Sequence, residues 1–457
     1  MAAAAQAPSL SRQLARHARA ARFDQLPAEA VAKVKIAFLD LLSCAYEALD
    51  LAPSAQAIKL AALGRGDAAV IGTDLRVPPG DAAFVNAVLS HGLVREDMHT
   101  GSVSHLGVVI FPALLALTHG RRIRGSDFLL AAVCGYEAGA AVGRAVMDRE
   151  TAPRFRPTGV TGPLGAALGG ALQRGLSEDA LVSALGLAAN TAAGLNEWPA
   201  SGADDMFFHA GFAARNAVTC VELAEAGAYA SEHALDGASG LFAALGRQER
   251  AANVRAFLHG QPLEILSVYH KPAPACNYAQ TACQVARTLI AEDGVRASEI
   301  EAIAVRVCAA ALHYPGCNVS GPFERVLQAK MSIPFCIAAT LVRGTIDEAN
   351  YRMLKDPEIL RLIGITSLEE DAAFTQAYPA RQGTEVIVNL VDGRTIRRRM
   401  EDLLAANDTE IRSRFRAACS NVLGADRAGE IEATADRIEQ LDDVSALSAL
   451  LGGQHAG

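Results

Sequence analysis

The chain has 457 residues, of which 51% are hydrophobic and 20% are charged, and its formal net charge is −8. This length predicts two domains rather than one core. The mixed-sign negative balance argues against a nucleic-acid partner or an anionic membrane surface, whereas a small anionic substrate needs only a few well-placed cations.

Two further features of the composition bear on the compartment. No apolar run reaches transmembrane length, so we expect no membrane partner. The nine cysteines are scattered and form no C-x-x-C pair. Such cysteines are typical of reduced core residues, which predicts a cytoplasmic protein.

The chain begins with MAAAAQAPSLSRQLARHARAARF, which has four arginines and no acid before Asp24. That composition resembles a transit peptide. An ordinary first helix is the favoured interpretation, because a similar Ala/Arg bias runs through the whole chain. Helical spacing of apolar residues continues, with almost no strand pattern, to about residue 265.

The segment GVTGPLGAALGGALQRGLS, residues 159–177, is dense in glycine and alanine. It has no G-x-G-x-x-G motif and no strand precedes it, so a phosphate-binding loop is disfavoured. Close packing of helices through small residues explains this composition better.

The pattern changes near residue 267. EIEAIAVRVCAAAL alternates as a strand does, and TEVIVNLVDGRTIRRRME predicts a hairpin turning at Asp392-Gly393. The tail is helical again. The fold class is therefore mainly α, with a large all-helical domain built from both chain ends (1–266 and 401–457) and a smaller α+β lid domain (267–400).

The stretch HGLVREDMHTGSVSHLGVVIFP, from His91 to Pro112, gathers titratable groups between apolar helices. Glu96 and Asp97 stand near His99 and His105. A histidine paired with a carboxylate can act as a general base. The same residues could bind a metal, but no other His/Cys cluster supports that interpretation and no metal is expected.

Three other polar segments are candidates. In RFRPTGVT, Arg156 and Thr158 could hold a carboxylate, or could form an ordinary capped loop. His209, in HAGF, could be catalytic, although a lone histidine is more often structural. Lys271, beside two prolines in HKPAPACNY, could be an acid, a base or an anion clamp, or a solvated loop lysine.

These segments together, in this order, resemble the 2-methylcitrate dehydratase (MmgE/PrpD) family, which also includes cis-aconitate decarboxylase and iminodisuccinate epimerase. The resemblance covers nearly the whole chain and rests on AFLDLLSC, FVNAVLSHGLVREDMHTGSVSHLGVVIFPALLAL, GSDFLLAAVCGYEAGAAVGRA, HAGFAARNAV, KPAPACNY, AKMSIPFCIAATL and VNLVDGR. It implies the two-domain fold described above, usually as a homodimer, with the site between the domains. It also implies small di- and tricarboxylate substrates and no metal or organic cofactor.

The resemblance carries over residue by residue only in part. The family's paired aspartates fall on Glu96 and Asp97, and its loop histidine, its lid lysine and the histidine of its H-A-G motif are kept, as His105, Lys271 and His209. Four positions change chemical type: Val94 replaces an aspartate, Arg156 a histidine, Met206 a lysine and Phe335 a tyrosine.

The hypothesis from the sequence is an enzyme that moves a proton α to a carboxylate without a cofactor, leading to dehydration, decarboxylation or epimerisation of a small carboxylic acid. His105 would be the acid or base, held by Asp97, and Lys271 would be the acid on the opposite face or a carboxylate clamp. The expected substrate-binding residues are Arg156, Thr158, His209, Glu96, His99, Tyr278, Met206 and Phe335. The alternative is a non-catalytic binding protein on the same fold.

Overall fold

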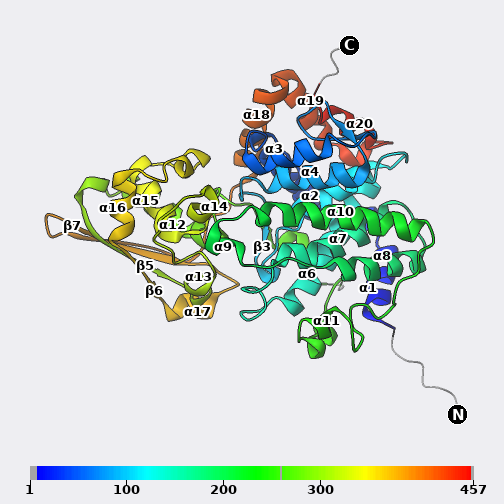
Figure 1. Cartoon of the computed structure of the whole chain (residues 1–457), viewed down its shortest axis with the longest axis horizontal. Helices are drawn as coiled ribbons and strands as arrows, with labels where there is room; N and C mark the ends of the chain where they lie inside the picture. The colour runs from blue at the N-terminus through cyan, green and yellow to red at the C-terminus, as the bar shows by residue number, and fades with distance from the viewer. Residues whose placement is uncertain (1–7, 258–259, 454–457) are drawn as a thin grey trace.

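The computed structural model describes residues 8–257 and 260–453. It consists of a large helical part and a smaller part that contains the main sheet (Figure 1). The larger part comprises α1 (Leu10–Ala20), α2 (Ala28–Glu47), α3 (Ala52–Ala61), α4 (Pro79–His91), α5 (Gly107–Ala116), α6 (Gly125–Val146), α7 (Pro157–Gln173), α8 (Glu178–Thr191), α9 (Trp198–Ser201), α10 (Asp205–Glu225) and α11 (Leu241–Ala244), with α18 (Asp408–Leu423), α19 (Ala425–Ala435) and α20 (Ser445–Leu450) from the C-terminal end. The predicted mainly α class is confirmed.

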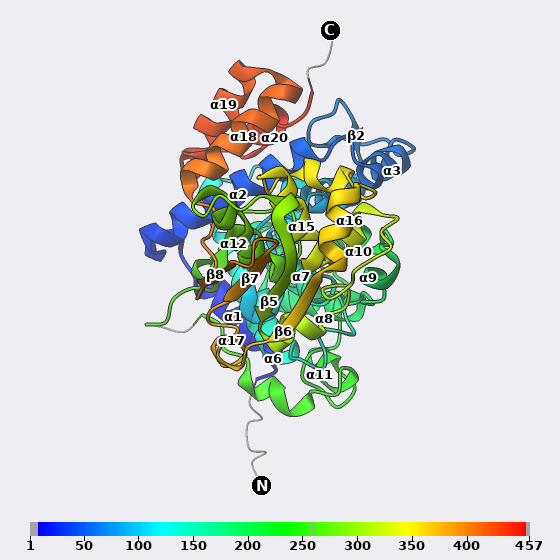
Figure 2. The same ribbon diagram turned by 90° about the vertical axis from the view of Figure 1, so that its left-hand side faces the viewer.

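The predicted first helix is present as α1, where Ser9 accepts a hydrogen bond from the backbone of Arg12 as an N-cap. The first seven residues of the arginine-rich N-terminal segment lie outside the described residues. The C-terminal tail returns to the helical part as expected: Tyr46 of α2 donates a hydrogen bond to the carbonyl of Leu451 (3.0 Å). Figure 2 shows α18, α19 and α20 together at one end of the molecule.

The smaller part is a four-stranded sheet with helices packed against it. The strand order is β6-β5-β7-β8, with β5 parallel to β6 and antiparallel to β7. The strands are β5 (Ile300–Val307), β6 (Thr366–Glu370), β7 (Thr384–Leu390) and β8 (Thr395–Met400), and the helices are α12 (Gln280–Ala291), α13 (Ala309–His313), α14 (Val326–Met331), α15 (Ile333–Arg343), α16 (Pro357–Gly364) and α17 (Ala372–Ala377).

The predicted strand and hairpin are confirmed as β5 and as β7 with β8. Gly393 has φ +84° at the turn between β7 and β8, a conformation that glycine adopts without strain. Strand β6 was not predicted, because its residues TSLEE are mostly polar and partly exposed at the sheet edge. The exact domain boundaries stay a prediction.

The expectation of an all-helical first domain needs a correction. Two short ladders occur there: β1 (Ala68–Ala69) pairs with β2 (Arg76–Val77), and β3 (Met98–His99) pairs with β4 (Val268–Tyr269). Two-residue strands leave no alternating pattern in a sequence. The β3–β4 ladder matters most, because it joins the His91–Pro112 stretch to the segment that carries Lys271.

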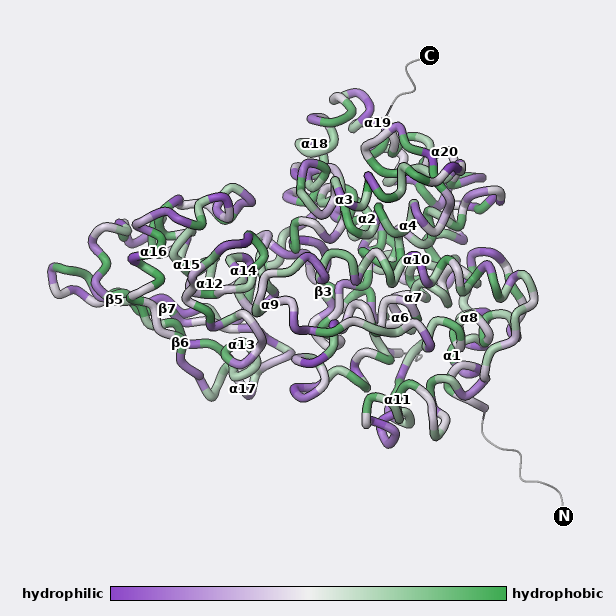
Figure 3. The backbone as a smooth tube through the Cα atoms, viewed as in Figure 1, coloured by the Kyte–Doolittle hydropathy of each residue, from purple (hydrophilic) through white to green (hydrophobic). Residues whose placement is uncertain are grey.

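Helix α6 corrects the expectation that no apolar segment is long enough to span a membrane. Its 22 residues are long and apolar enough to cross a membrane, but 94% of its most apolar window is buried inside the structure. A core helix of a soluble protein passes the same test of length and composition. Figure 3 shows α6 and its neighbours as pale to green segments in the middle of the helical part.

The small-residue packing predicted for residues 159–177 is confirmed where α7 crosses α6. A Cβ built on Gly165 would lie 2.5 Å from the backbone oxygen of Gly135, and one on Gly169 would lie 2.6 Å from that of Ala131. Since backbone atoms cannot rotate away, only glycine permits this approach.

We predict that Gly165→Ala destabilises the protein by about 1–3 kcal/mol, the usual range for an overpacked core. Gly429→Ala is the matched control, because Gly429 lies in α19 with no atom near its built Cβ. Urea unfolding followed by circular dichroism measures both. Equal unfolding midpoints for the two variants would contradict the packing argument.

Candidate active site

The candidate site is built where α4 ends, a short loop follows, and α5 begins. The loop contains β3, whose partner β4 places Met98 opposite Tyr269 and His99 opposite Val268. Lys271 lies two residues beyond β4. The ladder therefore holds the histidine-rich loop against the lysine loop, although about 170 residues separate them in the sequence.

These loops surround a small cavity with a volume of about 30 Å³, enough for one or two water molecules. A hollow of about 830 Å³ shares the walls Val103, Tyr278 and Tyr314 with this cavity. A substrate larger than water therefore requires these walls to move. The cavity is lined by Val94, Met98, Val103, His105, Arg156, Trp198, Met206, Lys271, Cys276, Asn277, Tyr278, Tyr314 and Met331.

One buried carboxylate organises the two histidines of the site. Glu96 Oε1 lies 2.6 Å from His91 Nδ1 and 3.1 Å from His105 Nδ1. His105 Nδ1 also lies 2.9 Å from the carbonyl oxygen of Asp97. Because both neighbours of this nitrogen are acceptors, Nδ1 must carry the proton in the neutral ring. His105 Nε2 is then the basic atom of the ring.

The protonation states follow from burial and charge. Burial lowers the pKa of His105 well below its usual value, and the positive charge of Lys271 lowers it further. Burial by itself would raise the pKa of Glu96, but the adjacent His91 and His105 hold it far below its usual range. At neutral pH the site therefore contains an ionised Glu96 and a neutral His105.

The expectation that Asp97 holds His105 is wrong in its geometry. The Asp97 carboxylate points to Tyr136, whose hydroxyl donates a hydrogen bond to Oδ2 (2.5 Å), and only the Asp97 carbonyl contacts the histidine. The side chains of the adjacent Glu96 and Asp97 therefore point to different partners, His105 and Tyr136.

Lys271 is fully buried, so the prediction of a desolvated lysine is confirmed over that of a solvated loop residue. Its Nζ donates hydrogen bonds to the carbonyls of Val94 (2.6 Å) and Ala275 (3.2 Å). Burial lowers its pKa, and the negative charge of Glu96 opposes this shift. An ammonium at a cavity wall can bind an anion or give up a proton.

The loop before Glu96 is held by a second buried lysine. Lys330 Nζ donates to the carbonyl of Leu93 (2.9 Å) and pairs with Glu348 (2.7 Å). Val94 has φ 58°, which is a rare backbone conformation for a β-branched residue. The two lysines thus secure a strained loop, and Val94 contributes its carbonyl rather than a polar side chain.

Arg156 lies at the N-cap of α7 and lines the cavity. Its Nη2 donates to His91 Nε2 (2.8 Å), and its guanidinium lies 5.6 Å from the centre of the Trp198 ring. Arg156 Nε is buried and has no hydrogen-bond partner within the part of the chain that the structure describes. Spare guanidinium donors beside a cavity suit a carboxylate ligand.

The remaining predicted residues divide between the wall and the surroundings. Met206 and Tyr278 line the cavity. Thr158 does not, and its hydroxyl accepts a hydrogen bond from the backbone of His105 (3.1 Å). His99 bonds to Glu264 (2.9 Å), which makes it a structural residue.

His209 and Phe335 also lie outside the cavity wall. The His209 ring packs near Gly194, close to the side chain of Arg156, and burial lowers its pKa to about 4. Phe335 packs against Phe323 and Tyr351. Neither side chain therefore reaches the cavity directly.

Sequence reasoning missed several residues. His91 bridges Glu96 and Arg156, and the only available signal was its place in the histidine-rich stretch. Trp198, Tyr314, Cys276 and Asn277 line the cavity from three separate segments. Cys276 and Asn277 belong to the lysine segment, whereas no spacing rule connects Trp198 or Tyr314 with the other residues.

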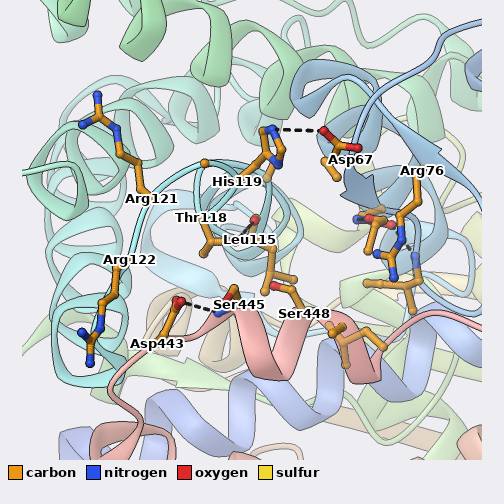
Figure 4. A pocket seen from close by; sticks show the side chains of 18 residues that line it. Asp67, Arg76, Leu115, Thr118, His119, Arg121, Arg122, Asp443, Ser445 and Ser448 are labelled. Atoms are coloured by element: carbon orange, nitrogen blue, oxygen red, sulfur yellow. Dashed lines mark hydrogen bonds and ion pairs between the residues drawn. The ribbon is translucent and has the colours of Figure 1, made fainter.

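Another hollow, of about 460 Å³, lies between the end of α5 and the C-terminal helix α20. Figure 4 shows that Arg121 and Arg122 extend away from Ser445 and Ser448, and that His119 is paired with Asp67. It contains none of the predicted site residues. Across residues 8–257 and 260–453, no group of three or more His, Cys, Asp or Glu side chains is arranged to hold a metal ion.

Asp97 generates a prediction about stability. Burial raises its pKa from 3.8 to about 7, so between about pH 4 and pH 7 the folded state keeps a proton that the unfolded state loses. This group therefore stabilises the fold most at the acidic end, and its contribution falls as the pH rises to 7. Each pKa unit corresponds to about 1.4 kcal/mol.

We expect Asp97→Asn to remove this decline, so that the difference in unfolding free energy between variant and parent changes by a few kcal/mol across that window. Urea unfolding at several pH values measures it. Parallel pH profiles for the two proteins would show that Asp97 does not titrate in this window.

Comparisons with known proteins identify the family of the chain. Residues 12–253 match the MmgE/PrpD N-terminal domain, and residues 273–440 match the MmgE/PrpD C-terminal domain. The chain is 28% identical to a cis-aconitate decarboxylase-like protein of Aspergillus oryzae, over 94% of each chain. It is 25% identical to cis-aconitate decarboxylase of Aspergillus terreus (94% and 93% covered) and 26% identical to that of Mus musculus (83% and 80% covered).

Decarboxylases are lyases, so these relatives indicate an enzyme of the lyase type. The two domain matches cover most of the chain, with the N-terminal domain before the C-terminal domain. The chain belongs to the MmgE/PrpD family.

Proposed function

We propose that this protein is a lyase that transfers a proton at a carbon next to a carboxylate in a small carboxylic acid. The observation that carries the proposal is the fixed tautomer of His105. Its Nδ1–H faces Glu96 and the Asp97 carbonyl, which leaves Nε2 as the proton-transfer atom of a residue that lines the cavity. Neither a metal nor an organic cofactor is needed for this step.

The walls of the cavity suggest the substrate. Arg156 has an unused buried donor, and Lys271 brings a second positive charge, so the site can hold an acid through one or two carboxylates. Met98, Met206 and Met331 form an apolar wall. Met206 supplies no cation, which favours a substrate with fewer carboxylates than 2-methylcitrate.

Decarboxylation is the outcome that we favour among lyase reactions. The carbon–carbon bond to the departing carboxylate would break, releasing CO₂, and its electron pair would pass to the neighbouring carbon. Lys271 would stabilise the negative charge that develops, and His105 would deliver the proton that completes the product. An anionic substrate raises the pKa of a nearby histidine, so binding itself would load His105 with this proton.

The names of the curated relatives support this choice. In a dehydratase the same Nε2 would instead remove the proton before water leaves. The two outcomes differ in the product and not in the residue that moves the proton.

The direct test incubates the protein in deuterated water with cis-aconitate, 2-methylcitrate and smaller unsaturated acids. NMR follows CO₂ loss, water loss and deuterium at the α and γ carbons. We expect label and CO₂ release with at least one acid. His105→Ala should lower turnover by about 10²–10⁴-fold, the usual contribution of general acid–base catalysis. Binding of an acid with no label and no product would instead support the non-catalytic alternative.

Glu96→Gln tests the tautomer argument. The neutral amide removes the negative charge that holds the His105 Nδ1–H and stabilises the protonated ring, so turnover should fall roughly tenfold or more. Glu96 also raises the pKa of His105, so its removal should move to lower pH the limb of the kcat/KM profile that reports the titration of His105. His99→Gln is the control, because His99 lies outside the cavity wall; an equal loss in both variants would refute the specific role of Glu96.

A further inference from the structure

Two cysteines from separate segments meet beside the cavity. Cys276 lines it, five residues after Lys271, and its Sγ lies 3.6 Å from the Sγ of Cys317. Cys317 follows Tyr314, which is another wall residue, and is fully buried. The proposed lyase reaction uses neither thiol.

The surroundings of the two thiols differ in a way that suits a redox pair. The hydrogen bond with Cys317 lowers the pKa of Cys276, and the backbone N–H of Tyr278 and the charges of Lys271 and Arg156 act in the same direction. Burial raises the pKa of Cys317. A thiolate near cations is the reactive form of cysteine, and a neutral thiol beside it can resolve an oxidised partner.

The cavity gives a small oxidant a place to react. Its volume of about 30 Å³ admits a molecule the size of one or two waters, and hydrogen peroxide is of that size. Cys283 and Cys336 are also neighbours, on α12 and α15, but neither lines this cavity. Proximity to a second thiol and a position on the wall occur together at Cys276.

We propose that Cys276 and Cys317 form a peroxide-sensitive dithiol that closes to a disulfide and reversibly disables the site. The Cys276 thiolate would attack one peroxide oxygen, breaking the O–O bond and giving a sulfenic acid and hydroxide, which takes up a proton to become water. The Cys317 thiol would then displace the sulfenic oxygen as a second water. Two thiols are oxidised by two electrons, and one peroxide is reduced to two waters.

Closure would move the site residues. A disulfide requires a sulfur separation of about 2.05 Å, against 3.6 Å between the two thiols. The shift acts on the segment that carries Lys271 and Tyr278 and on the one that carries Tyr314. The oxidised protein would also lose the thiolate charge beside Lys271. We therefore expect oxidation to lower turnover and a dithiol reductant to restore it.

The test treats the folded, reduced protein with hydrogen peroxide, blocks remaining thiols with an alkylating reagent in denaturant, and maps the peptides by mass spectrometry. The expected result is one linked Cys276–Cys317 peptide pair, lighter by two hydrogens, which dithiothreitol reverses. Finding both cysteines alkylated, or a different cysteine pair linked, would overturn the proposal. This readout does not depend on the lyase activity.

Two cysteine variants test which thiol reacts with peroxide and which one closes the disulfide. In Cys317→Ala, peroxide should leave a sulfenic acid on Cys276 that dimedone traps, with no linked peptide. Cys134→Ala is the matched control, because Cys134 is buried on α6 away from the cavity, and it should form the linked pair as the parent does. In the Cys317→Ala variant, dimedone labelling of Cys134 in place of Cys276 would also overturn the assignment.

Discussion

A single buried carboxylate orders the centre of this protein. Glu96 has almost no access to solvent, yet its two histidine neighbours and the nearby lysine keep it ionised. A buried charge is tolerated only when partners compensate for lost hydration. Its hydrogen bonds set the tautomers of His91 and His105, and His91 in turn accepts a hydrogen bond from Arg156. The chemistry of the site therefore depends on one anion being held in place.

The backbone around that anion is held as firmly as its side chain. Lys271 and Lys330 come from segments about 60 residues apart in the sequence, yet both donate to carbonyls of the loop just before Glu96. The β3–β4 ladder adds backbone hydrogen bonds on the other side. Movement of this loop would disturb these contacts, so the position of the loop and the alignment of His105 are physically coupled.

The structure shows what occupies each of the four positions at which this chain differs in chemical type from the family that it resembles. Val94 presents a carbonyl to Lys271, Arg156 bonds to His91, and Met206 adds an apolar wall. Phe335 lies away from the cavity, among other aromatic rings. The cavity lining thus combines the cation of Arg156 with the apolar side chain of Met206.

The sequence by itself determined the mainly α class, β5, the β7–β8 hairpin, the small-residue packing of α7, and the segments that carry His105, Lys271 and Arg156. These features leave periodic or compositional signals within one segment. Only the tertiary structure decided which carboxylate faces His105, that His91 and Tyr314 join the site, and that Cys276 meets Cys317. Such contacts depend on side-chain direction and on pairing across long separations, which local patterns do not record.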